Sequence, residues 1–366
     1  MNLQELINKA ESGDAVAQND LAICYEYGKG TKINLSEAIK WYKKAAEQGN
    51  VDAQFNLALC IEFGRGTEIN LCEAIKWYKK AAEQGDVDAQ YNLAICYEEG
   101  RGTEANLQKA IKWYQKAAEQ DYYAMNNLAV CYEEVSNFKE AFKLYETSAK
   151  QGHVEAQFNL ALCYEEGKGT DIDLKEAIKW YEKAAEQGYT EAQFNLCLLY
   201  FNKDDIESII KGLDWLVKAA KKGMEEAGSL LRDFIAEIIK LAELGDAEAQ
   251  FLLGRSFQNG DGVIMNQDEA FKWYKLSAEQ DYDKALNNLA CIYLECENYK
   301  EAKECFERAA KQDCALAQFN LGAMYNDGDT IERDISRAIY WLAKAAEHGI
   351  KAANEILDEI HEEQKS

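Results

Sequence analysis

The sequence predicts an all-α protein built as an α-solenoid, a rod of stacked helix hairpins. The string GNVDAQFNLALCIEFGRGTEINLCEAIKWYKKAAEQ fills residues 49–84, and close variants fill 85–120 and 152–187, so the period is 36 residues. A fixed period of this length is the signature of a repeat architecture. All seven tryptophans occupy one column of the repeat, namely Trp41, Trp77, Trp113, Trp180, Trp215, Trp273 and Trp341.

Each repeat is predicted to be two helices that pack as a hairpin. In the string above, Ala53 and Leu57 are spaced to share one helical face, and Trp77 and Ala81 share another after a gap. We call the first helix of a repeat helix A and the second helix B. The chain contains no proline, so glycine is expected to end the helices. Gly64 is placed to end helix A, because glycine readily takes the left-handed backbone of a helix stop.

The repeats divide the chain into two predicted arrays with a cap at each end. Residues 1–12 are expected to form an N-terminal capping helix, and residues 349–366 a polar C-terminal capping helix, because terminal repeats need a polar outer face. Residues 223–244 are too short for a hairpin, so they are either a degenerate unit or one long linking helix. The units are 13–48, 49–84, 85–120, 121–151, 152–187 and 188–222 in the first array (13–222), and 245–280, 281–312 and 313–348 in the second (245–348).

Composition and charge exclude several classes of protein. Acidic residues outnumber Lys and Arg by 65 to 41, and the net charge of −24 disfavours nucleic acid and anionic lipid as partners. No apolar run is long enough for a membrane span, and the N-terminus does not read as a signal peptide. We therefore expect a cytoplasmic protein, with the oligomeric state left open. Its eleven cysteines include five core-like ones in a single column: Cys24, Cys60, Cys96, Cys131 and Cys163.

The residues offer no candidate for a catalytic, metal or cofactor site. The three histidines, His153, His348 and His361, lie far apart along the chain and lack metal-ligand spacing. The Gly-x-Gly-Thr loops lack the G-x-x-x-x-G-K-S/T spacing of a phosphate-binding P-loop, and no strand precedes them. We therefore predict a protein that is not an enzyme and holds no cofactor.

The repeat resembles a known family. The pattern A-x-x-x-L-A/G-x-x-Y-x-x-G-x-G followed by A-x-x-W-Y-x-K-A-A-x-x-G is similar to the Sel-one-like repeat, a relative of the tetratricopeptide repeat. Units 121–151 and 281–312 lack the Gly-x-Gly loop and are more similar to plain tetratricopeptide repeats. The resemblance implies a right-handed superhelix with helix A on the concave surface. It also implies a protein-interaction scaffold or adaptor.

The predicted partner-binding surface consists of helix A positions that point away from the core. With about 100° per residue and Leu57 facing inward, Phe55 and Leu59 lie on roughly the opposite side and Glu62 lies beside them. Such a surface suits a basic or amphipathic protein segment. Alternatively, the aromatics pack on the neighbouring repeat and the acids are only a solvated face. The candidates are Phe55, Tyr91, Phe158 and Phe194, then Leu59, Ile95 and Leu162, then Glu62, Glu98, Glu99, Glu133, Glu134, Glu165 and Glu166.

Other features leave alternatives open. A microbial effector or signalling regulator would use the same surface, and a purely architectural or engineered array would also fit the near-identical units. A hydrolase resembling cysteine-rich Sel-one-like penicillin-binding proteins is disfavoured, because those proteins carry two cysteines per repeat. An asparagine column either binds a peptide backbone or, as we favour, ties one repeat to the next: Asn56, Asn92, Asn127, Asn159, Asn195, Asn288 and Asn320.

Overall fold

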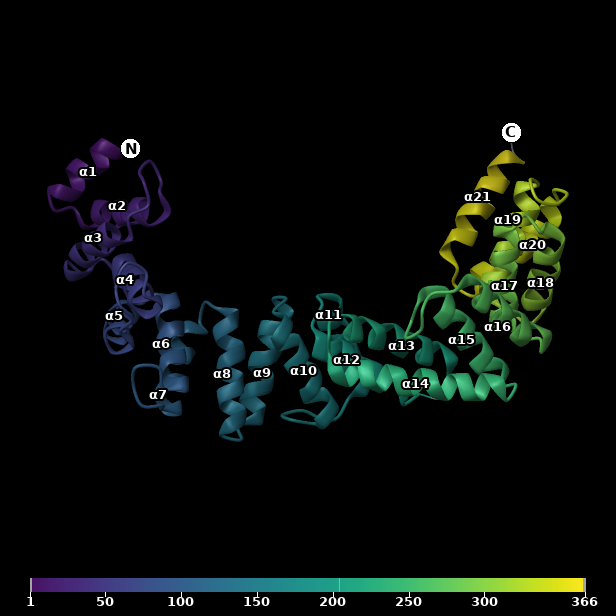
Figure 1. Cartoon of the computed structure of the whole chain (residues 1–366), viewed down its shortest axis with the longest axis horizontal. Coiled ribbons are helices and arrows are strands. Elements are labelled where there is room, and N and C mark those ends of the chain that lie inside the picture. Colours follow the sequence, from purple (N-terminus) through teal and green to yellow (C-terminus); the bar gives the residue numbers. More distant parts are fainter. Residues whose placement is uncertain (1, 204, 365–366) are drawn as a thin grey trace. The chain divides into compact units, whose positions relative to one another are not determined.

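The computed structural model describes residues 2–203 and 205–364, and the elements it contains there are 21 helices (Figure 1). The helices pack as consecutive hairpins, which confirms the predicted fold class. The helices are α1 (Leu3–Glu11), α2 (Ala15–Tyr27), α3 (Leu35–Glu47), α4 (Val51–Phe63), α5 (Leu71–Glu83), α6 (Val87–Glu99), α7 (Leu107–Ala117), α8 (Tyr122–Glu134), α9 (Phe138–Lys150), α10 (Val154–Glu166), α11 (Leu174–Glu186), α12 (Thr190–Phe201), α13 (Ile206–Lys221), α14 (Glu225–Glu243), α15 (Ala247–Asn259), α16 (Gln267–Glu279), α17 (Asp283–Glu295), α18 (Tyr299–Lys311), α19 (Ala315–Asp327), α20 (Ile335–Glu347) and α21 (Lys351–Glu363).

Helices A and B alternate in nine hairpins. Helices A are α2, α4, α6, α8, α10, α12, α15, α17 and α19, and each is followed by its helix B. The remaining helices are α1, α14 and α21. Helices α1 and α21 occupy the positions predicted for the two caps, of which residues 1, 365 and 366 lie outside the described residues.

The chain forms two compact units, one up to Ala192 and one from Gln193 onward.

The largest fully buried side chains form a tyrosine column in helix B, directly after the tryptophan column. Tyr78 is fully buried, whereas the neighbouring Trp77 keeps 8% of its surface exposed at the edge of the core. Aromatic burial of this size dominates core energetics. The column contains Tyr42, Tyr78, Tyr114, Tyr145 and Tyr181 in the first unit and Tyr274 in the second, with Phe306 at the equivalent place in α18.

Local sequence fixes the two ends of helix A. In the second repeat, the Asn50 side chain accepts a hydrogen bond from the Ala53 amide, as an N-cap residue does. The helix ends at Gly64, which takes the predicted left-handed backbone with φ +68°. The second glycine of the loop, Gly66, lies against the preceding repeat, because a Cβ placed on it would be 2.5 Å from the carbonyl oxygen of Leu35.

Buried glutamines join successive repeats. The side-chain amide of Gln54 donates to the carbonyl of Ala46, in the preceding helix B, at 3.1 Å. Its own oxygen accepts from Gln84, at the end of the following helix B, at 2.8 Å. Because buried polar groups require partners, these bonds hold neighbouring hairpins at one spacing. The same two bonds recur at Gln18, Gln157 and Gln250.

Residues 223–244 contain a single helix, α14, rather than a hairpin. Its first half follows α13 as a helix A would, and its last turn behaves as the end of a helix B. The carbonyl of Ala242 accepts from Gln250 of the next repeat at 3.1 Å, the bond made elsewhere by helices B. Gly262 of that next repeat also lies close to Leu231 and Ile235 of α14. The helix therefore takes both positions of a contracted repeat.

Candidate interaction surface

The first acidic column of helix A points toward helix B instead of lying free in solvent. Glu62 is 8% exposed and accepts a hydrogen bond from the buried Tyr78 hydroxyl at 2.5 Å. Burial, together with this hydrogen bond, raises the pKa of Tyr78 far above its ordinary value, so the phenol stays protonated as the donor. Equivalent bonds join Tyr42 to Glu26, Tyr114 to Glu98, Tyr145 to Glu133 and Tyr181 to Glu165.

Two of these buried carboxylates also bind a cation from the next repeat. Arg101 lies 3.0 Å from Glu62, and Arg65 lies 3.5 Å from Glu26. The arginines come from the Gly-x-Gly loops, which the sequence analysis treated only as helix stops. In the second unit, the Tyr274 hydroxyl donates to the neutral Gln258 at 2.7 Å. The acceptor of this hydroxyl can therefore be a carboxylate or an amide oxygen.

The acids directly after this column remain exposed at the end of helix A. Glu99 accepts from Arg101 at 2.5 Å, and Glu166 lies 2.6 Å from Lys168. Glu134 is exposed as well. Of the seven glutamates predicted to line the surface, Glu99, Glu134 and Glu166 are therefore the exposed ones, whereas Glu62, Glu98, Glu133 and Glu165 are at least partly buried.

The predicted aromatic and aliphatic columns are half-buried on helix A. Phe55 packs on Tyr78 of its own hairpin with ring centroids 5.9 Å apart, and Tyr91 and Phe158 pack in the same way on Tyr114 and Tyr181. Leu59, Ile95 and Leu162 are likewise half-buried. The last candidate, Phe194, packs against the core around Cys197 in the second unit. These side chains thus contribute to the hairpin core and still present an outer edge.

An exposed acidic column that the sequence analysis missed completes this stripe. Asp52, Asp88 and Glu155 are exposed and lie three residues before Phe55, Tyr91 and Phe158, on the same helical face. In the fourth repeat the equivalent position holds Tyr123, which is 49% exposed and packs on the His153 ring with centroids 4.6 Å apart. The sequence signal for this column was an acidic residue three positions before the aromatic. We call the columns of Asp52, Phe55 and Leu59 the A-face stripe.

Most asparagines of the column link repeats, as we favoured, whereas Asn92 donates to the Asp88 carbonyl of its own helix at 2.8 Å. Asn56 donates to Asn19 of the preceding repeat at 3.3 Å, and Asn159 donates to Asn126 at 3.1 Å. In the second unit, Asn320 donates to Asn287 at 3.1 Å. These amides belong to the contacts between hairpins.

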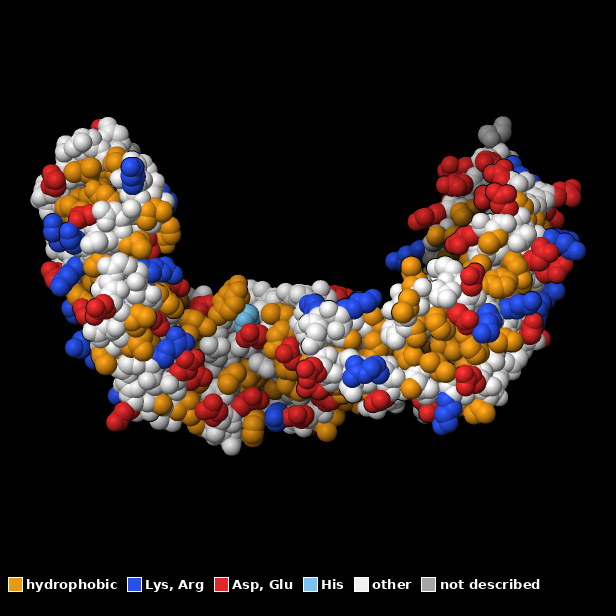
Figure 2. Space-filling model, viewed as in Figure 1, with side chains coloured by type: hydrophobic (Ala, Val, Ile, Leu, Met, Phe, Trp, Pro, Cys, Tyr) orange, Lys and Arg blue, Asp and Glu red, His pale blue; other side chains and the backbone are white. Residues whose placement is uncertain are grey.

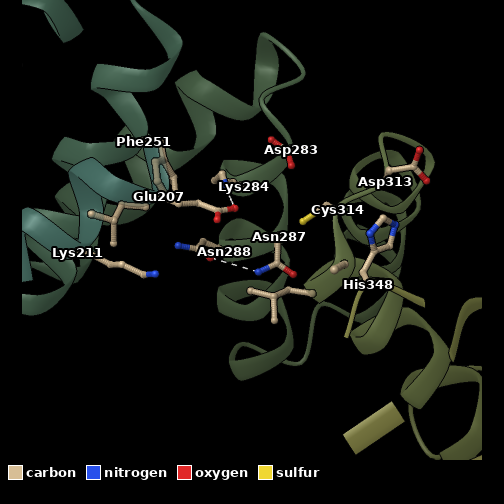
Figure 3. A pocket seen from close by; sticks show the side chains of 13 residues that line it. Glu207, Lys211, Phe251, Asp283, Lys284, Asn287, Asn288, Asp313, Cys314 and His348 are labelled. Carbon is tan, nitrogen blue, oxygen red and sulfur yellow. Dashed lines mark hydrogen bonds and ion pairs between the residues drawn. The ribbon is translucent and has the colours of Figure 1, made fainter. Parts of the chain in front are cut away.

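The second unit contains a pocket of about 600 Å³ on the same columns (Figure 3). Phe251 and Asn287 take the position of Phe55, and Lys284 and Leu316 take the position of Asp52 in α17 and α19. Glu207 and Lys211 from α13 lie at one end of the pocket, and Asp313, Cys314 and His348 lie at the other.

The pocket combines charged, amide and apolar groups. Lys284 pairs with Glu207 at 3.3 Å and so connects α17 to α13. Asn288 donates to the hydroxyl of Tyr274 at 3.1 Å, and Asn287 donates to Asn288 at 3.3 Å. Leu316 is 54% exposed and supplies an apolar edge. A site of this composition fits a short stretch of polypeptide, which offers both apolar side chains and backbone hydrogen-bonding groups.

Four of the five cysteines of the column, Cys60, Cys96, Cys131 and Cys163, are buried, and Cys24 is half-buried. Burial raises the pKa of Cys60 to about 12 and that of Cys96 to about 11, from a usual value of 9.0. The reactive species of cysteine is the thiolate. At pH 8 the thiolate fraction of Cys60 is therefore expected to be far lower than that of an unperturbed thiol. Cys72 and Cys296 are exposed.

We therefore expect an aromatic disulfide reagent to modify Cys72 and Cys296 rapidly in the folded protein. Cys60 and Cys96 should react only after denaturant is added. Absorbance of the released thiolate would give the rates, and mass spectrometry would locate the adducts. Changing Cys72 and Cys296 to Ser should remove the fast phase, whereas rapid labelling of Cys60 without denaturant would contradict the burial.

Within the described residues there is no cluster of three or more His, Cys, Asp or Glu side chains suited to a metal ion. None of the helices described combines the length and hydrophobicity needed to cross a bilayer.

Stacked hairpins with a repeated surface stripe define a helical repeat protein. The chain belongs to the Sel1 repeat family, which confirms the resemblance drawn from its motifs. Residues 283–314 match the tetratricopeptide repeat instead. The fourth unit, which lacks the Gly-x-Gly loop, is matched as a Sel1 repeat and not as a tetratricopeptide repeat. The Sel1 matches cover residues 15–50, 51–86, 87–122, 123–153, 154–189, 190–224, 247–282 and 315–350.

Known proteins resemble this chain over large parts of it. The crystal structure of a protective antigen from uropathogenic Escherichia coli, which has the Sel1-like fold, is 32% identical. It aligns over 98% of this chain and 82% of its own, with a TM-score of 0.59. Chitin synthase regulatory factor 3 of Schizosaccharomyces pombe is 30% identical over 60% of this chain. DAP3-binding cell death enhancer 1 of Rattus norvegicus is 35% identical over 46%. The chain spans only 27% and 36% of the lengths of these two curated relatives.

Proposed function

We propose that the chain is a non-enzymatic scaffold that binds segments of other proteins along the A-face stripe. The observation that carries this proposal is the pocket of the second unit, because it is lined by the same repeat columns that form the stripe in the first unit. Repeat proteins present such continuous surfaces because each hairpin contacts only its neighbours and leaves one face open. The printed names of the two curated relatives, a regulatory factor and a DAP3-binding protein, are consistent with action through another protein.

The partner segment we propose for the first unit is basic and amphipathic. Helices A of this unit, α2, α4, α6, α8 and α10, contain twelve acidic residues and no Lys or Arg. Half-buried aromatic and aliphatic side chains lie beside the exposed acids Asp52, Asp88 and Glu155. Acidic groups next to apolar anchors attract a cationic segment and set its register, while the anchors supply most of the affinity.

Removing the exposed acids of the stripe is expected to weaken binding at least tenfold, equivalent to about 1.4 kcal/mol. The probe is a peptide chosen from a random phage-displayed library on the intact chain and then synthesised with a fluorescent label. Its anisotropy would be titrated with the parent chain and with the triple variant Asp52→Asn, Asp88→Asn and Glu155→Gln. We expect the selected peptides to be rich in Lys, Arg and apolar residues.

The matched control removes three exposed acids from helices B by changing Glu47, Glu83 and Glu186 to Gln. This control variant alters the net charge by the same amount as the first triple variant. Its affinity for the peptide should stay within about twofold of that of the parent chain. Because all six positions are exposed, both variants should unfold at nearly the parent temperature. Equal affinity of the two triple variants, or selected peptides without basic residues, would refute the acidic stripe.

A further inference from the structure

A second surface lies at the ends of helices A in the first two repeats, where large apolar side chains are left in solvent. Tyr27 and Phe63 are 59% and 54% exposed, and Ile33 and Ile69 in the following loops are each 65% exposed. We call these four residues the apolar ridge. On the face drawn in Figure 2, hydrophobic side chains lie among Lys and Arg side chains over the N-terminal helices. Several large apolar side chains exposed at the same positions of adjacent repeats are typical of an interaction site.

The ridge is confined to these two repeats because the same column is acidic farther along the chain. The positions of Tyr27 and Phe63 are taken by Glu99, Glu134 and Glu166 in the third, fourth and fifth repeats. In the third and fifth repeats, the loop cation two residues later pairs with that glutamate, at 2.5 Å for Arg101 and 2.6 Å for Lys168.

In the first two repeats, the equivalent cation lies over an aromatic ring. The Lys29 ammonium is 5.6 Å from the Tyr27 ring centroid, and the Arg65 guanidinium is 5.5 Å from that of Phe63. Lys32 is a third cation in these loops, against the single acid Glu68. Lys29 lies on a ring face, whereas Arg65 also lies 3.5 Å from the Glu26 carboxylate, so Lys29 and Lys32 are the cations that this surface offers to a ligand.

We propose that the apolar ridge, with Lys29 and Lys32, binds an acidic amphipathic segment of a partner protein. The apolar side chains of that segment pack on Tyr27, Phe63 and the two isoleucines, and its carboxylates bind the flanking cations. This surface goes beyond the proposed function, because the A-face stripe is acidic and selects a ligand of the opposite charge. One chain thereby binds a basic segment along the A-face stripe and an acidic segment at the ends of helices A in the first two repeats.

The test uses an 18-residue labelled peptide with Leu and Phe on one helical face and Glu on the other, and a counterpart with Lys for Glu. The intact chain should bind the Glu peptide, and the double variant Tyr27→Glu and Phe63→Glu should bind it at least tenfold more weakly. These substitutions install the residue that the chain itself uses at the same column. Changing Ile172, an exposed loop isoleucine of the fifth repeat, to Ser is the matched control and should change nothing.

A gain-of-binding variant tests the proposal independently. Glu99→Phe extends the ridge into the third repeat and frees Arg101 from its exposed partner, so it should tighten binding of the Glu peptide severalfold. The proposal fails if the double variant binds as the parent does, or if the intact chain prefers the Lys peptide at the ridge. It also fails if the ridge instead binds phosphatidylserine vesicles, or pairs two copies of the chain in sedimentation. Binding at the A-face stripe should be the same in all these variants.

Discussion

Replacing Tyr78 with Ala should destabilise the hairpin of α4 and α5 by about 5 kcal/mol, the largest loss we expect from a single side chain. Deleting a fully buried aromatic ring costs about 3–5 kcal/mol. The change also removes the hydroxyl that donates to Glu62 at 2.5 Å. Leaving the buried carboxylate without this donor lowers the stability by about 1–3 kcal/mol more.

Two further variants separate these contributions. Tyr78→Phe keeps the ring and should cost about 1–3 kcal/mol, since it removes only the donor to the carboxylate. Trp77→Ala should cost about 3–5 kcal/mol. Hydrogen exchange in α4 and α5 is the appropriate measurement, because long repeat arrays do not unfold as one cooperative unit. Greater protection loss in Trp77→Ala than in Tyr78→Ala would show that the tryptophan, and not the tyrosine, is the centre of the hairpin core.

Gly66→Ala should be the most damaging change at a glycine, with an expected loss of about 2–5 kcal/mol. Gly66 has φ +76°, which costs a residue with a side chain about 1–2 kcal/mol. The added methyl group would also meet the Leu35 carbonyl of the preceding repeat at 2.5 Å. Backbone atoms of a packed helix cannot move aside as a flexible side chain can, so the two hairpins must separate.

The chain provides graded controls for this prediction. Gly85 has φ +98° with open space around it, so Gly85→Ala should show only the backbone cost of about 1–2 kcal/mol. At Gly64 a Cβ would meet the Ile69 side chain at 2.9 Å, and that isoleucine is exposed and can shift. Chemical denaturation followed by circular dichroism would rank the three variants. A loss at Gly66 equal to that at Gly85 would mean that the repeats do not approach closely at this loop.

The repeat pattern predicted the helices and their stops because every hairpin restates the same local signals. Gly64 ends helix A as expected, and the inward-facing Leu57 is buried. The pairing of Glu62 with Tyr78 was not predicted, because it joins residues sixteen positions apart whose distance depends on how helix B crosses helix A. The two hydrogen bonds of Gln54 were not predicted for a similar reason, since both partners lie at the ends of other helices.

The surface was predicted less completely than the core. Phe55 and Leu59 were identified from helical geometry alone, and both have an outer edge in the structure. Asp52 was not predicted, because it lies one turn before the aromatic, in the first turn of helix A. The significance of Tyr27 and Phe63 depends on comparing one column across repeats together with exposure, and sequence spacing does not report exposure.

The bonds from Arg65 to Glu26 and from Arg101 to Glu62 run in one direction only, from each repeat to the buried carboxylate of the repeat before it. The first repeats therefore have a polarity, because the buried carboxylate of each hairpin is paired with an arginine of its C-terminal neighbour. Truncation after residue 64 would leave Glu26 without its cation, whereas deletion of the first repeat would leave Glu62 and Arg101 together. During synthesis, a hairpin would reach its full stability only after the next loop had left the ribosome.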